Sequence, residues 1–428
     1  METTLPMVLR LTAEDEAKLA GDHGPGVAMA MRLVVALARV SQAARLIDIE
    51  SAHIDGCLYH GQAGLDFIEK LVALGAKVTV PTTLNVSSLD MLHPGLVRLD
   101  PTESAAARRL MDAYVAIGAR ATWTCAPYQL EGRPAAGTDI AWAESNAIVF
   151  ANSVLGARTA RYGDFADVCA AVTGRVPLAG LHIQENRVPT LELDCSSIPD
   201  RVLDSDAAWA ALGFLVGREV GEQVSILTGI APTVVNEDRL KALGATAASS
   251  GGVALIHVAG FTPEALEAGD AWPAAGVPRI EVTSELLRAA RDTLTTATQG
   301  DELNAVALGT PHFSLAEFAK LAEAVQDRVP FDPSCTVWIS TSREVLAHAR
   351  EQGYAQLCEE VGARLVVDTC TYLVPVLADS VRTAMTTSGK WAWYAPANMG
   401  INVVLGTLAE CIASARSGRV IRDESSWS

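Results

Sequence analysis

A short apolar stretch followed at once by a polar loop recurs along this sequence, and the recurrence limits the folds that the chain can adopt. The stretches run from Lys77 to Val80, from Gly252 to Val258, from Ala305 to Leu308 and from Arg364 to Val367. Helical periodicity occurs between them, as in Gly64 to Leu74, which stops at Gly75. Strands that end in polar loops are where α/β proteins place their ligands. The pattern therefore predicts an α/β protein with helices covering buried strands and several lobes around one cleft.

The length and composition of the chain agree with this architecture. Its 428 residues, of which 50% are hydrophobic, suffice for more than one core and indicate two or three lobes. No low-complexity segment or long linker separates these lobes, so the sequence leaves their boundaries open. A first helix is expected to begin after Thr12, because Glu14 and Asp15 follow it in the manner of a capped N-terminus.

The charge and hydropathy patterns exclude two classes of partner. Apolar stretches such as Val34 to Val40 are far shorter than the roughly 20 residues of a membrane-spanning helix. The segment from Met1 to Arg10 lacks the basic start and apolar core of an export signal. The net charge is −17 without any Lys/Arg-rich run, whereas nucleic-acid binding needs a basic face. We therefore expect a cytoplasmic protein that binds neither membranes nor nucleic acid.

The eight cysteines are far apart in the sequence, and none belongs to a Cys-x-x-Cys pair. In a cytoplasmic chain of this size they are expected to be reduced thiols rather than a disulfide framework. Cys125 lies just before Pro127 on an expected irregular loop, Cys370 follows a buried strand, and Cys411 is flanked by small residues. Taken alone, each thiol is most simply a small buried hydrophobe.

The segment from Ala141 to Thr159 holds many polar side chains among apolar ones. If the segment is buried, each polar group needs a partner, because an unmade hydrogen bond costs on the order of 1–3 kcal/mol. Arg158 is suited to a substrate carboxylate, which a guanidinium meets with two parallel bonds. A solvated helix is the alternative interpretation. The polar residues in question are Glu144, Ser145, Asn146, Asn152, Ser153 and Arg158.

Three further clusters carry groups that could do chemistry. Residues 51–60 hold a histidine, an aspartate and a cysteine within five positions, which suits a proton relay, metal ligands or a satisfied turn. Residues 309–314 offer a hydroxyl and an imidazole after a strand. Residues 385–390 offer hydroxyls and a cation beside a flexible glycine, which suits either an anion or a surface turn.

Together these segments resemble the aconitase X proteins over nearly the whole chain, from Ser51 to about Ala415. One position departs from the family pattern: where Asn is expected after Thr159, this chain has Ala160, which cannot bond a polar substrate group. The segments that carry the resemblance, all in one order, are Ser51 to Cys57, Val80 to Asn85, Thr124 to Tyr128, Trp142 to Asn146, Ala151 to Thr159, Gly309 to Ser314, and Asp368 to Cys370.

The resemblance implies an aconitase-like fold of α/β lobes around an iron–sulfur cluster, with residues 1–428 forming the catalytic large subunit. It also implies a dehydratase acting on cis-3-hydroxy-L-proline or on mevalonate 5-phosphate. Some family members carry a swivelling domain on the same chain, and others have it as a separate small subunit. Because this sequence begins directly with catalytic-lobe sequence, we expect it to lack the swivel domain and to bind a small-subunit partner.

Carried over residue by residue, the resemblance implies Cys125, Cys370 and Cys411 as ligands of the cluster, whose nuclearity stays open. Soft thiolates suit such clusters, and three of them leave an iron open to act as a Lewis acid on the departing hydroxyl. Cys57 is expected to line the pocket. The substrate-binding candidates are Thr82, Thr83, Asn85, Glu144, Ser145, Asn146, Asn152, Ser153, Arg158, Thr310 and His312.

Dehydration also needs a base for the proton on the carbon next to the carboxylate. Ser388 beside Lys390 is one candidate arrangement, and His53 or Cys57 is another; the sequence does not choose between them. We expect cis-3-hydroxy-L-proline as substrate and Δ1-pyrroline-2-carboxylate as product, because the site motifs offer few basic groups for a phosphate. The alternatives are a mevalonate 5-phosphate dehydratase, giving trans-anhydromevalonate 5-phosphate, and a non-catalytic iron–sulfur sensor protein.

Overall fold

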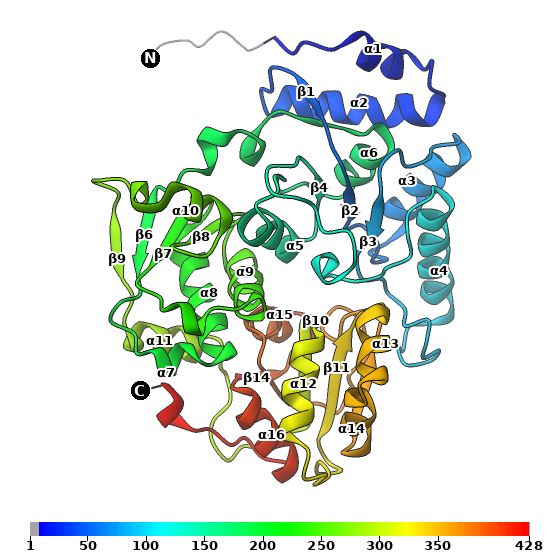
Figure 1. Cartoon of the computed structure of the whole chain (residues 1–428). Helices are drawn as coiled ribbons and strands as arrows, with labels where there is room; N and C mark the ends of the chain where they lie inside the picture. The colour runs from blue at the N-terminus through cyan, green and yellow to red at the C-terminus, as the bar shows by residue number, and fades with distance from the viewer. Residues whose placement is uncertain (1–7, 428) are drawn as a thin grey trace.

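Three parallel sheets and one antiparallel strand pair organise residues 8–427, which the computed structural model describes. Each parallel sheet belongs to one lobe, and the lobes follow one another along the chain. In Figure 1 the first lobe is at the top in blue to teal, the second is at the left in green, and the third is at the bottom in yellow to red. The α/β class expected from the sequence is confirmed.

The first lobe is built on the parallel sheet β3-β2-β4, with the antiparallel pair β1–β5 beside it. Thr12 and Asp15 form a capping box at the start of its first helix, as expected. The elements of this lobe are α1 (Ala13–Ala20), α2 (Pro25–Val40), β1 (Leu46–Asp48), β2 (Ala52–Ile54), α3 (Gln62–Ala73), β3 (Thr82–Leu84), α4 (Pro101–Ala116), β4 (Ala141–Trp142), α5 (Ser145–Phe150), α6 (Ala166–Thr173) and β5 (Arg175–Pro177).

The second lobe has the parallel sheet β8-β7-β6-β9. Its two longest helices, α8 and α9, pack closely because Gly213 and Gly217 leave room for the α9 backbone: a Cβ on Gly213 would lie 2.3 Å from the Leu243 carbonyl oxygen. The α9 helix also contacts α5 of the first lobe and α15 of the third. The elements are β6 (Leu191–Asp194), α7 (Asp200–Leu203), α8 (Asp206–Val220), β7 (Ser225–Thr228), α9 (Glu237–Ser250), β8 (Ile256–Val258), α10 (Pro263–Ala268), β9 (Arg279–Glu281) and α11 (Ser284–Thr293).

The third lobe has the five-stranded parallel sheet β12-β11-β10-β13-β14. Alternate residues of its strands face two separate cores: Ala305 and Ala307 face the one that holds Trp391 of α15, and Val306 and Leu308 face the other. The elements are β10 (Ala305–Phe313), α12 (Leu315–Ala324), β11 (Thr336–Thr341), α13 (Arg343–Glu351), α14 (Tyr354–Glu360), β12 (Ala363–Val366), β13 (Thr383–Thr386), α15 (Gly389–Met399), β14 (Asn402–Leu405) and α16 (Leu408–Ser417).

Several expected strand boundaries are wrong. Residues 252–255 are not a strand, since β8 begins only at Ile256. Residues 77–80 are not a strand; the strand is β3, because Thr82 pairs with Ala52 of β2 while Val78 and Val80 pack against the first-lobe core without pairing. Strand β10 continues beyond Leu308 to Phe313, through a register shift at Gly309. The residues expected to form loops after Val80 and after Leu308 therefore lie in strands.

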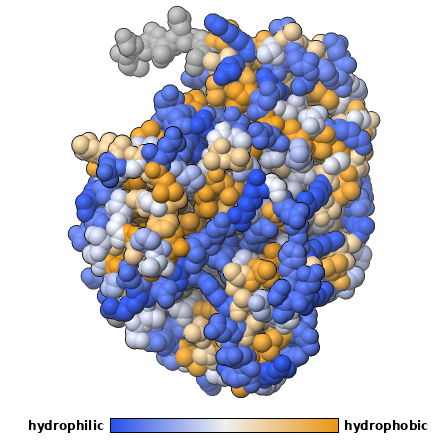
Figure 2. Space-filling model, viewed as in Figure 1, coloured by the Kyte–Doolittle hydropathy of each residue, from blue (hydrophilic) through white to orange (hydrophobic). Residues whose placement is uncertain are grey.

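Hydrophilic side chains cover much of the face drawn in Figure 2 and predominate across its middle, where the lobes meet. Within residues 8–427, none of the helices has both the length and the apolar character that crossing a membrane requires.

Candidate active site

A cavity of about 290 Å³ combines the groups that the chemistry of a lyase needs. Two thiols, two carboxylates and a lysine line it, together with amide and hydroxyl groups. They come from the first and third lobes. Four other cavities compared with it have no cysteine in their lining. We therefore take this one as the candidate active site and call it the thiol cavity.

Three polar side chains of the thiol cavity follow neighbouring strands of the first-lobe sheet. Asp55 comes directly after β2, Asn85 directly after β3, and Glu144 two residues after β4. The carboxyl ends of parallel strands meet at one edge of a sheet, which brings these three side chains together. Asn85 Nδ2 donates a hydrogen bond to Asp55 Oδ1.

Glu144 and Lys390 form a buried ion pair at the thiol cavity. Lys390 Nζ lies 2.5 Å from Glu144 Oε1 and 3.3 Å from Ser145 Oγ. Glu144 also caps α5, since its Oε2 accepts the backbone N–H of Ala147 at 2.8 Å. Burial by itself would lower the pKa of Lys390, but the Glu144 carboxylate and other neighbouring acidic groups together outweigh burial and keep that pKa well above its ordinary value. The lysine is therefore a fixed cation.

Asn146 supports the wall of the thiol cavity from behind and does not line it. Its Nδ2 donates to the carbonyl oxygen of Cys125 at 2.8 Å and to Glu144, while its Oδ1 accepts a 2.6 Å bond from Tyr128 Oη. This predicted substrate-binding residue thus fixes the backbone beside one thiol.

Cys125 and Cys370, two of the three ligands that the resemblance implies, both line the thiol cavity. The backbone N–H of His312 donates to Cys125 Sγ at 3.3 Å, and Thr310 Oγ1 is 3.6 Å from Cys370 Sγ. Burial raises the pKa of both thiols, so they are neutral until a metal displaces their protons. Buried thiols with hydrogen-bond donors on their sulfurs fit an iron–sulfur cluster.

Cys411, the third predicted ligand, is not brought to this cavity. It lies on α16 in the core on the opposite face of the third-lobe sheet from Cys125 and Cys370, and its nearest charged or thiol neighbours are Glu410 and Cys335. The β-sheet of the third lobe therefore separates Cys411 from the other two thiols. Within residues 8–427, no three His, Cys, Asp or Glu side chains converge in a geometry for one metal ion.

Four polar lining residues were missed as site residues: Asp55, Tyr372, Tyr394 and Asn398. Lys390, Tyr394 and Asn398 are spaced by four along α15, so they face the cavity as one stripe. The rings of Tyr372 and Tyr394 stack with centroids 5.7 Å apart and form its aromatic wall. The four-residue spacing was a signal in the sequence, and Asp55 stood in a polar run already singled out.

The three candidates for the base other than Lys390 do not line the thiol cavity. Ser388 caps α15 by accepting the Trp391 N–H at 3.1 Å, and it donates to the carbonyl of Thr310. Burial lowers the pKa of His53 to about 3, and burial raises the pKa of Cys57 well above its ordinary value.

The threonines near the cavity bond within their own lobe, whereas His312 of the third lobe bonds the first. Thr82 Oγ1 donates to the Val80 carbonyl at 2.8 Å, and Thr83 Oγ1 lies 2.8 Å from the Nδ1 of His53. His312 is buried, with its Nδ1 2.9 Å from Thr124 Oγ1, and burial lowers its pKa to about 4. His312 therefore acts on the cavity through its backbone N–H, while its ring is neutral.

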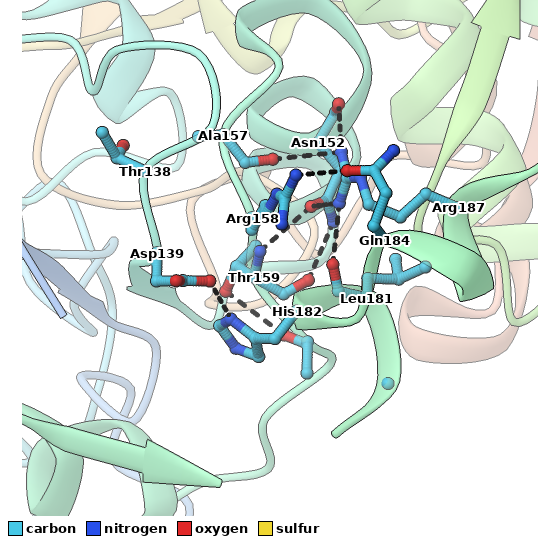
Figure 3. A network of polar contacts seen from close by, with 12 residues as sticks. Thr138, Asp139, Asn152, Ala157, Arg158, Thr159, Leu181, His182, Gln184 and Arg187 are labelled. Atoms are coloured by element: carbon cyan, nitrogen blue, oxygen red, sulfur yellow. Dashed lines mark hydrogen bonds and ion pairs between the residues drawn. The ribbon is translucent and has the colours of Figure 1, made fainter. Parts of the chain in front are cut away.

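Asn152, Ser153 and Arg158 lie away from the thiol cavity. Asn152 and Arg158 belong to the network of polar contacts in Figure 3. Asn152 Oδ1 accepts from the Thr159 N–H and from Arg187, both at 3.0 Å. Ser153 Oγ accepts the Ile256 N–H of the second lobe at 2.9 Å. Arg158 bonds Gln184 and lines a separate cavity beside Trp272. Asn152, whose Nδ2 also donates to the Ala254 carbonyl at 3.0 Å, and Ser153 thus join the first lobe to the second.

Comparison with known proteins shows the class of enzyme to which the chain belongs. Its relatives are dehydratases, which are hydro-lyases, and the chain is a member of this class. Models of the first, second and third domains of aconitase X match residues 8–185, 189–292 and 303–417. The chain belongs to the aconitase X family. These three segments coincide with the three lobes and supply the boundaries that the sequence left open.

Two relatives and one solved structure illustrate the similarity. A cis-3-hydroxy-L-proline dehydratase of Pseudomonas aeruginosa is 42% identical over 96% of this chain and 70% of its own length. A phosphomevalonate dehydratase large subunit of Methanothermobacter thermautotrophicus is 36% identical over 92% of this chain and 96% of its own length. The holo-form of Thermococcus kodakaraensis aconitase X superposes with a TM-score of 0.84 and 34% identity, covering 95% of this chain and 100% of that one.

Proposed function

We propose that this chain is the catalytic large subunit of an enzyme that dehydrates cis-3-hydroxy-L-proline to Δ1-pyrroline-2-carboxylate. The observation that carries the proposal is the charge of the thiol cavity. Lys390 is its one basic lining residue and is already paired with Glu144, while Asp55 adds a second carboxylate. Such a cavity suits a small zwitterion with one carboxylate and one ammonium group better than a phosphate dianion.

The polar groups of the cavity match those of the amino acid. Lys390 and the Ser145 hydroxyl bind the substrate carboxylate, since both face the cavity beside each other. Asn85 Oδ1 is buried and accepts no hydrogen bond within the described residues, so it is available to the ring ammonium. The stacked Tyr372 and Tyr394 exclude water from the apolar face of the ring.

Cys125 and Cys370 are the thiols that we propose to hold an iron–sulfur cluster. The cluster, when bound, supplies an iron that acts as a Lewis acid on the departing hydroxyl. The His312 N–H and the Thr310 hydroxyl stabilise the two thiolates by hydrogen bonds. Cys411 lies behind the sheet and takes no part in this set.

A small subunit completes the enzyme in this proposal. The chain spans 96% of a relative that is named a large subunit but 70% of the hydroxyproline dehydratase relatives. The part of those relatives that the chain does not match would then be supplied by a second polypeptide, the swivel-domain subunit.

The test is a two-substrate assay. The chain is co-expressed with the small subunit of its own organism, purified without oxygen, and given cis-3-hydroxy-L-proline or mevalonate 5-phosphate. We expect formation of the cyclic imine from the first and at least 100-fold lower kcat/KM with the second. The reverse preference would assign the phosphomevalonate activity instead, and an iron-loaded complex that turns over neither would favour the sensor function.

A further inference from the structure

A second cavity, of about 550 Å³, lies where the first lobe meets the second, and we call it the junction cavity. The first lobe contributes Arg158 and Gln184 to its wall, and the second lobe contributes residues of α10 together with Trp272. The junction cavity and the thiol cavity have no lining residue in common. The two cavities are therefore separate sites.

Arg158 brings a cation to the junction cavity that no acidic side chain neutralises directly. Its Nη2 donates a hydrogen bond to Gln184 Oε1, as Figure 3 shows. Within residues 8–427 the guanidinium forms no other hydrogen bond and no ion pair, and its Nε is buried without an acceptor. An arginine has five N–H donors, so Arg158 keeps most of its donors unused.

The neighbouring Arg187 already holds the two lobes together at this place. It is fully buried, and all five of its N–H groups are engaged. Their acceptors are Glu264, the Oδ1 of Asn152 and the carbonyl oxygens of Asn152, Ala157 and Leu181. Arg158, in contrast, is half-buried with donors to spare, which suits the recognition of a carboxylate by two parallel bonds.

Two carboxylates of α10 line the junction cavity on the side of the second lobe. Glu264 and Glu267 are three positions apart and therefore lie on one face of the helix. Glu264 Oε1 accepts from Arg187 at 2.7 Å, while its Oε2 is buried without a donor in the described part of the chain. Because two carboxylates balance the two arginines, a ligand that carries one charge of each sign fits better than an anion or a cation.

Trp272 gives the junction cavity an apolar wall. Its ring is half-buried and packs against the ring of His257 with the centroids 4.7 Å apart, which fixes its position. Pro263 and Ala268, at the two ends of α10, extend this apolar surface. The cavity thus offers an apolar contact beside groups of both charges.

We propose that the junction cavity binds a small α-amino acid with an apolar side chain, as its zwitterion. The carboxylate of the ligand pairs with Arg158, its ammonium group is held by Glu264 and Glu267, and its side chain packs against Trp272. The ligand contacts both lobes at once and so stabilises their junction. This binding goes beyond the proposed dehydratase activity and does not depend on it.

The experiment is isothermal titration calorimetry on the complex of this chain with its small subunit, with L-leucine and L-phenylalanine as probes. We expect saturable binding of at least one probe with a dissociation constant below about 1 mM. The amide of that probe lacks the carboxylate and its N-acetyl derivative lacks the ammonium group, so each should bind at least 10-fold more weakly. The bound probe should also raise the melting temperature, because it binds the folded state.

Variants of the cavity wall locate the bound probe. R158M removes the cation but keeps the apolar stem of the side chain, and A268F fills the cavity without altering a charge. Both should weaken binding at least 10-fold, and R158K should bind more tightly than R158M because it restores the charge. Arg218 of α8 is exposed and likewise forms no ion pair within residues 8–427, so R218M is the matched control and should bind within twofold of wild type.

Three outcomes would overturn the inference. Unchanged affinity in R158M and A268F would place the probe at another site. An amide that binds as tightly as the free amino acid would show that Arg158 does not recognise a carboxylate. Absence of saturable binding of both probes to the folded complex, including a case in which the small subunit covers the cavity, would refute the site whether or not the complex dehydrates hydroxyproline.

Discussion

The ion pair between Lys390 of the third lobe and Glu144 of the first lobe should contribute strongly to the free energy of unfolding. The two side chains are 7% and 4% exposed, and they join residues 246 positions apart. Removing one partner of such a pair leaves a buried charge uncompensated, which costs about 3–5 kcal/mol. In K390M the Glu144 carboxylate keeps the Ala147 N–H and Asn146 as donors. We therefore expect a loss near the lower limit, about 3 kcal/mol.

Equilibrium unfolding in urea, followed by the fluorescence of the buried Trp391 beside Lys390, measures this loss. The double variant K390M/E144Q should be less destabilised than the sum of its single variants by about 2 kcal/mol or more, because it leaves no unpaired charge. The exposed pair Arg328–Glu360, with side chains 68% and 36% exposed, is the control: R328M should cost less than about 1 kcal/mol. Additive effects of K390M and E144Q would refute the reasoning.

Two further predictions concern the thiols and the bulge of β10. C125S and C370S should lose visible cluster absorption and bound iron, whereas C411S should keep both; loss of iron in C411S would show that its thiol reaches the cluster. G309A should destabilise the protein by at least about 1 kcal/mol, because Gly309 has φ +84° and a Cβ there would lie 2.0 Å from the Ser340 carbonyl oxygen. G300A, also at positive φ (+87°) but with open space around it, should cost less; equal losses in thermal melting would contradict the steric argument.

The strand-to-loop pattern of the sequence was enough to predict the class of fold, whereas the resemblance to the family singled out Asn85 and Glu144 as candidate site residues. Asp55, Asn85 and Glu144 each follow a strand, and the rule that ligands lie at carboxyl ends of parallel strands places them together. The same pattern gave wrong limits for β3, because Pro81 and two threonines have the composition of a loop although Thr82 and Thr83 pair with β2. Pairing partners far away in the sequence decide such short strands.

The positions of Cys411 and Arg158 could not be derived from local patterns. Which face of the third-lobe sheet α16 covers depends on the path of the whole chain, and no residue near Cys411 encodes it. Arg158 stands in a polar segment that matches the family, yet its partner Gln184 and its neighbour Trp272 lie far along the chain. The resemblance in sequence singled out both residues, but it did not reveal that they lie away from the thiol cavity.

A contact between the first and third lobes sets the geometry of the thiol cavity. The two residues that make this contact, Ser87 and Asp368, do not line the cavity themselves. Asp368, two positions before Cys370, has φ +64°, a conformation that costs a non-glycine residue roughly 1–3 kcal/mol. Two other groups hold it there. Its carboxylate accepts two bonds from Arg343 of its own lobe, at 2.7 and 2.6 Å, and its carbonyl accepts the N–H of Ser87 from the first lobe at 2.7 Å. Because Ser87 lies two residues after Asn85, this contact ties the strand end that positions Asp55 to the loop that carries Cys370. The contact therefore holds the Asn85 wall and the Cys370 wall of the thiol cavity against each other, and catalysis by positioned groups requires such a fixed arrangement.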